Sequence, residues 1–112
     1  MTAASVFQVH SEKEIQIVRE LFWECLTWAN DMNEQEFGLR LDIAAMLEED
    51  IAHLGKFMPP DGCLLLIQSD GSIAGCVCFK KLSTSIGEVK RLYIRPIFRG
   101  KGSGKMLVSS LL

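Results

Sequence analysis

The sequence contains no apolar stretch near the roughly 18 residues that a membrane-spanning helix needs. Residues 1–14 contain no basic segment followed by an apolar one, which argues against a secretory signal. Neither sign of charge is in large excess, since 12 basic and 14 acidic residues give a net charge of -2. We therefore expect a cytoplasmic protein that binds neither membranes nor nucleic acid through its overall charge.

Closely spaced cysteine pairs are also absent. The four cysteines, Cys25, Cys63, Cys76 and Cys78, show no C-x-x-C spacing. Without a secretory signal, this usage predicts reduced thiols rather than a disulfide framework. A zinc site made of His53, Cys63, Cys76 and Cys78 is disfavoured, because structural zinc sites use tighter ligand pairs. We expect no metal, and core packing explains why Cys76 and Cys78 share one side of a strand.

The length of 112 residues and the 48% hydrophobic content predict one small globular domain over residues 1–112. Residues 6–9 alternate weakly, as in a first strand. Ser11 and Glu14 form a capping-box pattern before apolar residues that recur at helical spacing from Ile15 to Met32. Residues 30–38 are expected to form a loop. Asp42 is expected to cap a second helix that ends at Gly55.

Three strands are predicted next. Apolar runs at residues 63–67 and 73–79 flank an Asp-Gly turn, which is a strong hairpin signal. A third run at residues 88–94 is stopped by Pro96, and a helix is expected to begin at about Gly104. The fold class is therefore α/β in the α+β sense: one strand, two helices, an antiparallel three-strand meander and a further helix.

The chemistry is expected in residues 87–112, where a basic, glycine-rich turn joins a strand to a helix. Glycines at positions 100, 102 and 104 allow positive φ, so that successive N–H groups can converge on phosphate oxygens. Arg99, Lys101 and Lys105 add positive charge at the helix start. The segment predicts an anion site. The alternative is a plain glycine turn with solvated lysines, in which nothing would offset the conformational entropy lost by ordering three glycines.

Two common phosphate loops do not fit this segment. The P-loop requires a glycine where Arg99 stands and a serine or threonine where Met106 stands. The G-x-G-x-x-G dinucleotide fingerprint requires a glycine at Lys105 or at Leu107. A nucleotide-binding domain of either type is therefore disfavoured.

The pattern (Q/R)-x-x-G-x-(G/A) does fit, as Arg99-Gly100-Lys101-Gly102-Ser103-Gly104. It follows Leu92-Tyr93-Ile94-Arg95-Pro96, and the two segments together resemble motif A of the GNAT superfamily of N-acetyltransferases. The resemblance covers the chain in the family's order of elements and stops soon after motif A. It implies a GNAT domain that is incomplete at its C-terminus, without the later strands and helix.

The resemblance also implies a co-substrate, acetyl-CoA, and assigns the residues that hold it. Strand 88–94 would contact the pantetheine arm through backbone groups at Leu92, Tyr93 and Ile94. Loop residues 99–104 would contact the pyrophosphate, with Lys105 as a weaker contact. The implied reaction is acetyl transfer to a primary amine by direct attack on the thioester. The alternative is a truncated CoA-binding module without activity.

Glu88 lies where several members of this family have a glutamate that acts as general base. The other interpretation is a solvated strand-end residue paired with Lys90 or Arg91. Strict alternation places Glu88 and Ile94 on one side of this strand and Tyr93 on the other, and the resemblance implies a β-bulge that resolves the mixed pattern.

The acceptor side is less defined by the sequence. The resemblance places acceptor selection at about residues 30–40. Trp23 and Trp28 either line an acceptor pocket or cover the sheet. Because no later strand follows strand 88–94, we expect its free edge to cause self-association of the chain.

Overall fold

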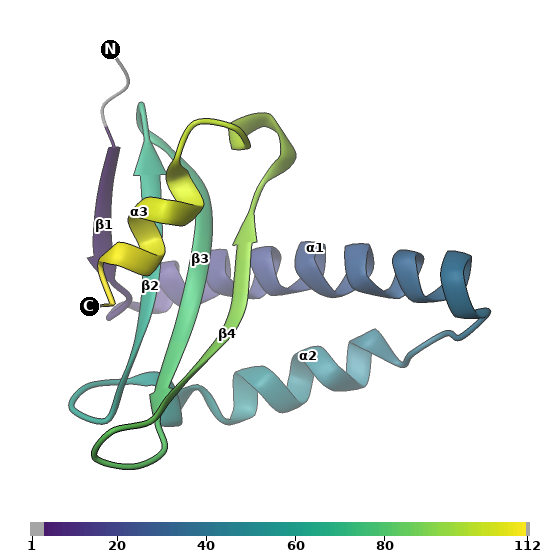
Figure 1. Cartoon of the computed structure of the whole chain (residues 1–112), viewed down its shortest axis with the longest axis horizontal. Coiled ribbons are helices and arrows are strands. Elements are labelled where there is room, and N and C mark those ends of the chain that lie inside the picture. Colours follow the sequence, from purple (N-terminus) through teal and green to yellow (C-terminus); the bar gives the residue numbers. More distant parts are fainter. Residues whose placement is uncertain (1–3, 112) are drawn as a thin grey trace.

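The computed structural model describes residues 4–111 and contains a four-stranded sheet covered by helices on both faces (Figure 1). In chain order the elements are β1 (Ala4–Gln8), α1 (Glu12–Phe37), α2 (Ile43–Ala52), η1 (Leu54–Phe57), β2 (Gly62–Ser69), β3 (Ser72–Lys81), β4 (Gly87–Ile94), η2 (Pro96–Phe98) and α3 (Ser103–Ser109). The sheet order is β1-β2-β3-β4, and every neighbouring pair is antiparallel. The predicted class and order of elements are confirmed, including the three-strand meander.

Helix α1 begins where the capping box predicts. Ser11 accepts a hydrogen bond from the Glu14 backbone, and the Glu14 carboxylate accepts one from Ser11 N–H. The helix continues to Phe37, so the loop predicted for residues 30–38 is wrong. No glycine or proline interrupts the sequence before Gly38, which ends the helix at φ 67. Only residues 38–42 connect α1 to α2.

Helix α2 is capped by Asp42, which accepts a hydrogen bond from Ala45 N–H at 3.1 Å, as predicted. It ends at Ala52, earlier than the predicted end at Gly55. The chain then tightens into the 3₁₀ turn η1, which turns Leu54 and Phe57 into the core.

The predicted hairpin between β2 and β3 is confirmed. Asp70 and Gly71 both have positive φ, at 50° and 85°, between the paired residues Ser69 and Ser72. These two conformations match the twist of a two-residue hairpin. The strands are longer than predicted because their ends extend into polar residues. Helix α3 begins at Ser103, and the predicted terminal position Leu112 lies outside the described residues.

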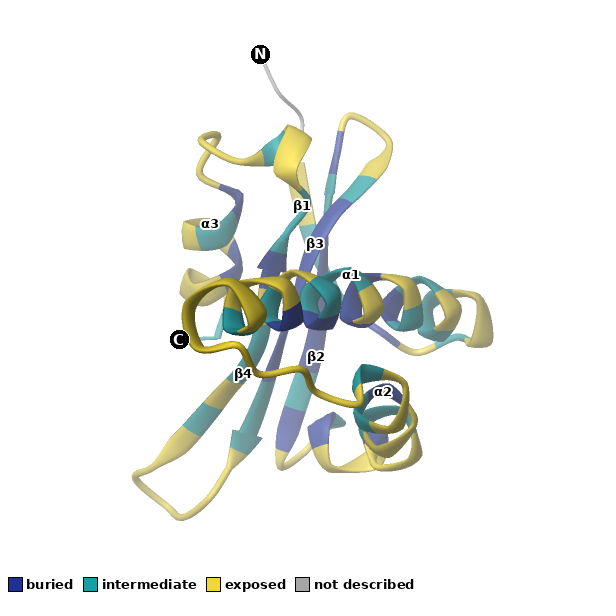
Figure 2. Ribbon diagram, turned by 90° about the vertical axis from the view of Figure 1, so that its right-hand side faces the viewer, coloured by how far each residue is buried: buried dark blue, intermediate teal, exposed yellow. Residues whose placement is uncertain are grey.

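Two apolar clusters lie on opposite faces of the sheet, and Figure 2 shows the buried residues along the strands and on the inner side of α1. Cys76 and Cys78 pack toward α1 and α2, as core packing predicts, whereas Cys63 packs in the cluster under α3. The candidate zinc ligands therefore lie on two faces of the sheet. Within residues 4–111, no group of three or more His, Cys, Asp or Glu residues is arranged to hold a metal ion.

Strand β4 contains the bulge that the resemblance implies. Tyr93 pairs with Cys76 and Lys90 pairs with Cys78, so two residues of β4 stand opposite Val77 alone. One of them, Arg91, has φ 53. The bulge reverses the faces beyond it, so the side chains of β4 do not alternate strictly, as the expected bulge implies. Tyr93 packs toward α1, on the same face of the sheet as Glu88 and Lys90. Ile94 packs on the other face, toward α3.

Strands β3 and β4 approach each other very closely just after the bulge. A Cβ built on Gly75 would lie 2.2 Å from the carbonyl oxygen of Tyr93 and 2.6 Å from the Ile94 side chain. Only a glycine leaves room for the β4 backbone at this point.

Candidate functional site

A cavity of about 300 Å³ lies beside β4, between that strand and α1. Its lining residues are Cys25, Trp28, Leu92, Tyr93, Ile94, Arg99 and Gly104. The structure thus brings together, at one place, the three predicted strand residues and the two ends of the predicted loop. Cys25 and Trp28 come from α1, and the sequence indicated only Trp28 as a pocket residue.

The two tryptophans of α1 are each about half exposed, at 44% for Trp23 and 53% for Trp28, so neither is fully buried. Only Trp28 reaches the cavity. Burial raises the pKa of the neighbouring Cys25 thiol, which therefore stays protonated near neutral pH and adds to the apolar wall.

One edge of β4 faces this cavity. In the described part of the sheet, β4 pairs with β3 and has no strand on its other side. Arg95 N–H donates to Ala74 O at 2.8 Å, so the neighbouring backbone groups of Ile94 face away from β3. Arg99 Nε donates to Ile94 O at 2.9 Å, and its guanidinium lies 5.6 Å from the centre of the Tyr93 ring. The Ile94 carbonyl, which points away from β3, therefore already accepts a hydrogen bond from a side chain outside the sheet.

The loop between β4 and α3 has the conformation that its glycines predict, with one exception. Gly100 and Gly102 have φ values of 81° and 82°, and Gly102 precedes the first turn of α3. Gly104 instead lies within α3, where a Cβ would stand 3.8 Å from the Ile94 side chain. Its lack of a side chain leaves space beside the cavity rather than allowing positive φ.

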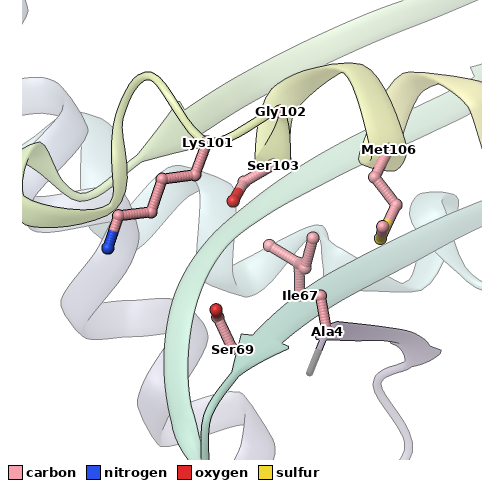
Figure 3. A pocket seen from close by; sticks show the side chains of 7 residues that line it. All are labelled: Ala4, Ile67, Ser69, Lys101, Gly102, Ser103 and Met106. Carbon is pink, nitrogen blue, oxygen red and sulfur yellow. The ribbon is translucent and has the colours of Figure 1, made fainter. Parts of the chain in front are cut away.

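The other side of the loop borders a smaller cavity of about 90 Å³. Lys101, Gly102 and Ser103 line it together with Ala4, Ile67, Ser69 and Met106 (Figure 3). The hydroxyl groups of Ser69 and Ser103, both on buried residues, point toward one another across it. The predicted loop residues thus divide between two cavities, whereas Gly100 and Lys105 are exposed residues that line neither.

An acidic residue that the sequence analysis did not single out stands next to the larger cavity. Glu24 of α1 accepts a hydrogen bond from Tyr93 Oη at 3.3 Å and forms an ion pair with Arg95. Burial, and then the negative charge of Glu24, raise the pKa of Tyr93. Arg95 also donates to the carbonyl of Ile73 at 3.2 Å. These contacts fix the end of β4 against α1.

Glu88 does not line the cavity. It is half-buried opposite Lys80, four residues before Leu92, which is roughly 13 Å along an extended strand. Neither ion pair proposed for it from the sequence is formed in the described residues, because Arg91 pairs with Asp50 and Lys90 has no carboxylate partner. His53, named above among the candidate zinc ligands, is a surface residue that contacts Glu49.

Residues 15–112 match the sequence model of the acetyltransferase (GNAT) family. An uncharacterized N-acetyltransferase of Schizosaccharomyces pombe is 34% identical over 80 residues, which are 70% of this chain and 49% of that protein. The chain thus spans about half the length of this curated relative.

Solved structures with this fold include the PaiA N-acetyltransferase of Thermoplasma acidophilum in complex with coenzyme A. Its TM-score is 0.72 at 18% identity, covering 97% of this chain and 69% of that one. A GNAT-family acetyltransferase of Staphylococcus aureus Mu50 has a TM-score of 0.65 at 15% identity, covering 96% and 63%. No helix among residues 4–111 is both long and apolar enough to cross a membrane. On the match to the family over residues 15–112, this chain belongs to the GNAT family of acetyltransferases.

Proposed function

We propose that this chain is the acetyl-CoA-binding part of an N-acetyltransferase that transfers an acetyl group to a primary amine by direct attack on the thioester. The observation that carries the proposal is the cavity beside β4, which joins the outward edge of that strand to both ends of the glycine loop. An apolar wall next to a basic, glycine-rich loop suits a ligand with a long neutral arm and an anionic end.

In this proposal the pantetheine arm pairs with the β4 edge at Leu92 and Ile94. To do so it replaces the hydrogen bond that Arg99 Nε makes to the Ile94 carbonyl, which frees the guanidinium for the pyrophosphate. The loop amides from Arg99 to Gly104 hold the same group, helped by the exposed charge of Lys101. The coenzyme A complex of the Thermoplasma relative supports this assignment at the level of fold.

The reaction needs a neutral amine beside the thioester and stabilisation of the oxyanion that forms. The backbone N–H of Leu92 is assigned to the oxyanion, because it follows the bulge and lies at the cavity. Glu88 is assigned to removing the proton of the ammonium substrate through water, since its side chain does not reach the cavity directly.

Calorimetry with CoA tests the proposal. Gly102→Asp and Gly104→Asp place a negative charge in the loop and should abolish CoA binding. Gly38→Asp is the matched control for Gly102→Asp, because Gly38, like Gly102, has positive φ with nothing within 4 Å of a built Cβ, yet ends α1 away from the loop. Unchanged CoA affinity in both folded loop variants contradicts the proposal. CoA binding without acetyl transfer to any amine of a broad panel favours the alternative, an inactive CoA-binding module.

A further inference from the structure

The bulge of β4 contains a residue whose backbone conformation is unusual for its type. Arg91 has φ 53, a left-handed value that a side chain with a Cβ adopts at an energetic cost. Such a conformation persists only where the surrounding contacts hold it. Two contacts from different elements do so here.

The first contact fixes the Arg91 side chain. Its Nε lies 2.8 Å from Oδ2 of Asp50 on α2, and the two side chains are only 23% and 17% exposed. An ion pair this far from solvent is screened less than a surface pair, and losing one partner leaves the other charge poorly solvated. Asp50 therefore ties α2 to the bulge.

The second contact fixes the Arg91 backbone. The thiol of Cys76, which is fully buried, donates to the carbonyl oxygen of Arg91 at 3.4 Å. Burial holds the pKa of Cys76 well above its usual range, so the donor proton stays in place at neutral pH. Arg91 is thus held from α2 through its side chain and from β3 through its carbonyl.

The geometry points to Asp50 as a positioning residue for the thioester. By holding Arg91 in the left-handed conformation, Asp50 keeps the next backbone N–H, that of Leu92, directed away from β3 and toward the cavity. Arg95 N–H bonds to Ala74 on β3, so the alternation of backbone groups back along β4 makes Leu92, like Ile94, face outward as long as the bulge at Arg91 keeps this register. The inference rests on the proposed function, because the group to be positioned is the donor assigned there to the oxyanion that forms from the thioester carbonyl.

The test compares two ligands on the 112-residue chain, because acetyl-CoA has the thioester carbonyl and CoA does not. Asp50→Ala should weaken binding of acetyl-CoA about three- to tenfold more than binding of CoA, as expected for losing one hydrogen bond. Asp50→Asn keeps an acceptor for Arg91 without the charge and should fall between Asp50→Ala and the unmodified chain. Glu48→Ala is the matched control, since Glu48 lies on the same helix but pairs with Arg19 of α1.

A second pair of variants isolates the backbone role. Glycine adopts φ 53 without a Cβ penalty, so Arg91→Gly should preserve the bulge and make Asp50 dispensable. Adding Asp50→Ala to Arg91→Gly should then leave the ratio of the two affinities unchanged. Equal weakening of both ligands by Asp50→Ala, or a further change of the ratio in the double variant, overturns the inference. If the unmodified chain binds CoA but Asp50→Ala does not change the ratio of the acetyl-CoA and CoA affinities, the inference alone is refuted. If the unmodified chain does not bind CoA, the proposed function is refuted as well.

Discussion

Glu24 and Arg95, 71 positions apart in the sequence, form a two-point contact in which Arg95 Nε donates to both carboxylate oxygens at 3.2 and 3.3 Å. The pair joins the middle of α1 to the residue before Pro96, where the chain leaves β4 for the glycine loop. The position of the loop relative to α1 therefore depends on this contact.

Arg95→Met should lower the free energy of unfolding by about 1–3 kcal/mol, between the values for exposed and buried ion pairs. It should also weaken CoA binding, because the loop loses its connection to α1. Denaturant unfolding and calorimetry measure the two effects. Arg40→Met, which removes the exposed pair with Glu34, should change both much less. Equal effects of the two variants would contradict the assigned role.

Glu88→Gln should reduce kcat for acetyl transfer by about 10²-fold or more and leave the KM for acetyl-CoA nearly unchanged, as expected for a general base. Steady-state kinetics with an amine that the protein acetylates measure both constants. Glu12→Gln, at the exposed start of α1, is the control. A wild-type kcat in Glu88→Gln would leave Glu88 as a strand residue without a catalytic role.

Cys25 and Cys63 provide a chemical test of the larger cavity. Burial raises the pKa of both thiols, so each should react slowly with iodoacetamide at neutral pH. Saturating CoA should slow the alkylation of Cys25, which lines the cavity, but not that of Cys63 on the opposite face of the sheet. Mass spectrometry of modified peptides follows each site. Cys78, whose pKa is raised to about 12 by burial, should stay unmodified throughout. Equal protection of Cys25 and Cys63 would indicate a global effect of CoA.

Much of the fold follows from local sequence. The Ser11 capping box, the Asp42 cap and the Asp70-Gly71 turn were predicted because each depends on side chains within four residues of one another. The helical extension of α1 through residues 30–37 was missed, since polar residues suit a loop as well as an exposed helix.

The lining of the larger cavity was predicted in part. The strand and loop residues were identified because the motif is contiguous, and five of them meet at one cavity. The contacts that hold these strand and loop residues in place were not predicted. Asp50 and Arg91 are 41 positions apart, and no sequence periodicity relates them. Only the fold brings α2 against the bulge.

The stability of the chain should depend on pH through Glu14. Its carboxylate accepts hydrogen bonds from the backbone N–H groups of His10 and Ser11, at 2.9 and 3.2 Å, which lower its pKa below the ordinary 4.5. A lowered folded-state pKa gives stability that is fully present above about pH 4.5 and is lost as the pH falls through the folded value. Thermal unfolding of the chain and of Glu14→Gln should therefore converge as the solution is acidified. A gap that stays constant with pH would contradict this.

The open edge of β4 should make the isolated chain associate with itself, because an edge strand offers unpaired N–H and C=O groups. Val89, which is 49% exposed on β4, is a suitable site for a test. Val89→Lys should shift the chain toward monomer in size-exclusion chromatography with light scattering. Val108→Lys, on the exposed side of α3, is the control. A monodisperse monomer at all concentrations would show that this edge does not pair.

The close approach of β4 to Gly75 restricts which sequences can form this site. Any side chain at position 75 would meet the Tyr93 carbonyl and displace β4 from β3 at the level of the cavity. Gly55, by contrast, has nothing within 4 Å of a built Cβ. In a library that samples every amino acid at each position, we expect only glycine to survive at position 75 and many residues at position 55. Position 75 is therefore restricted to glycine by the backbone of the neighbouring strand, although glycine contributes no functional group to the site.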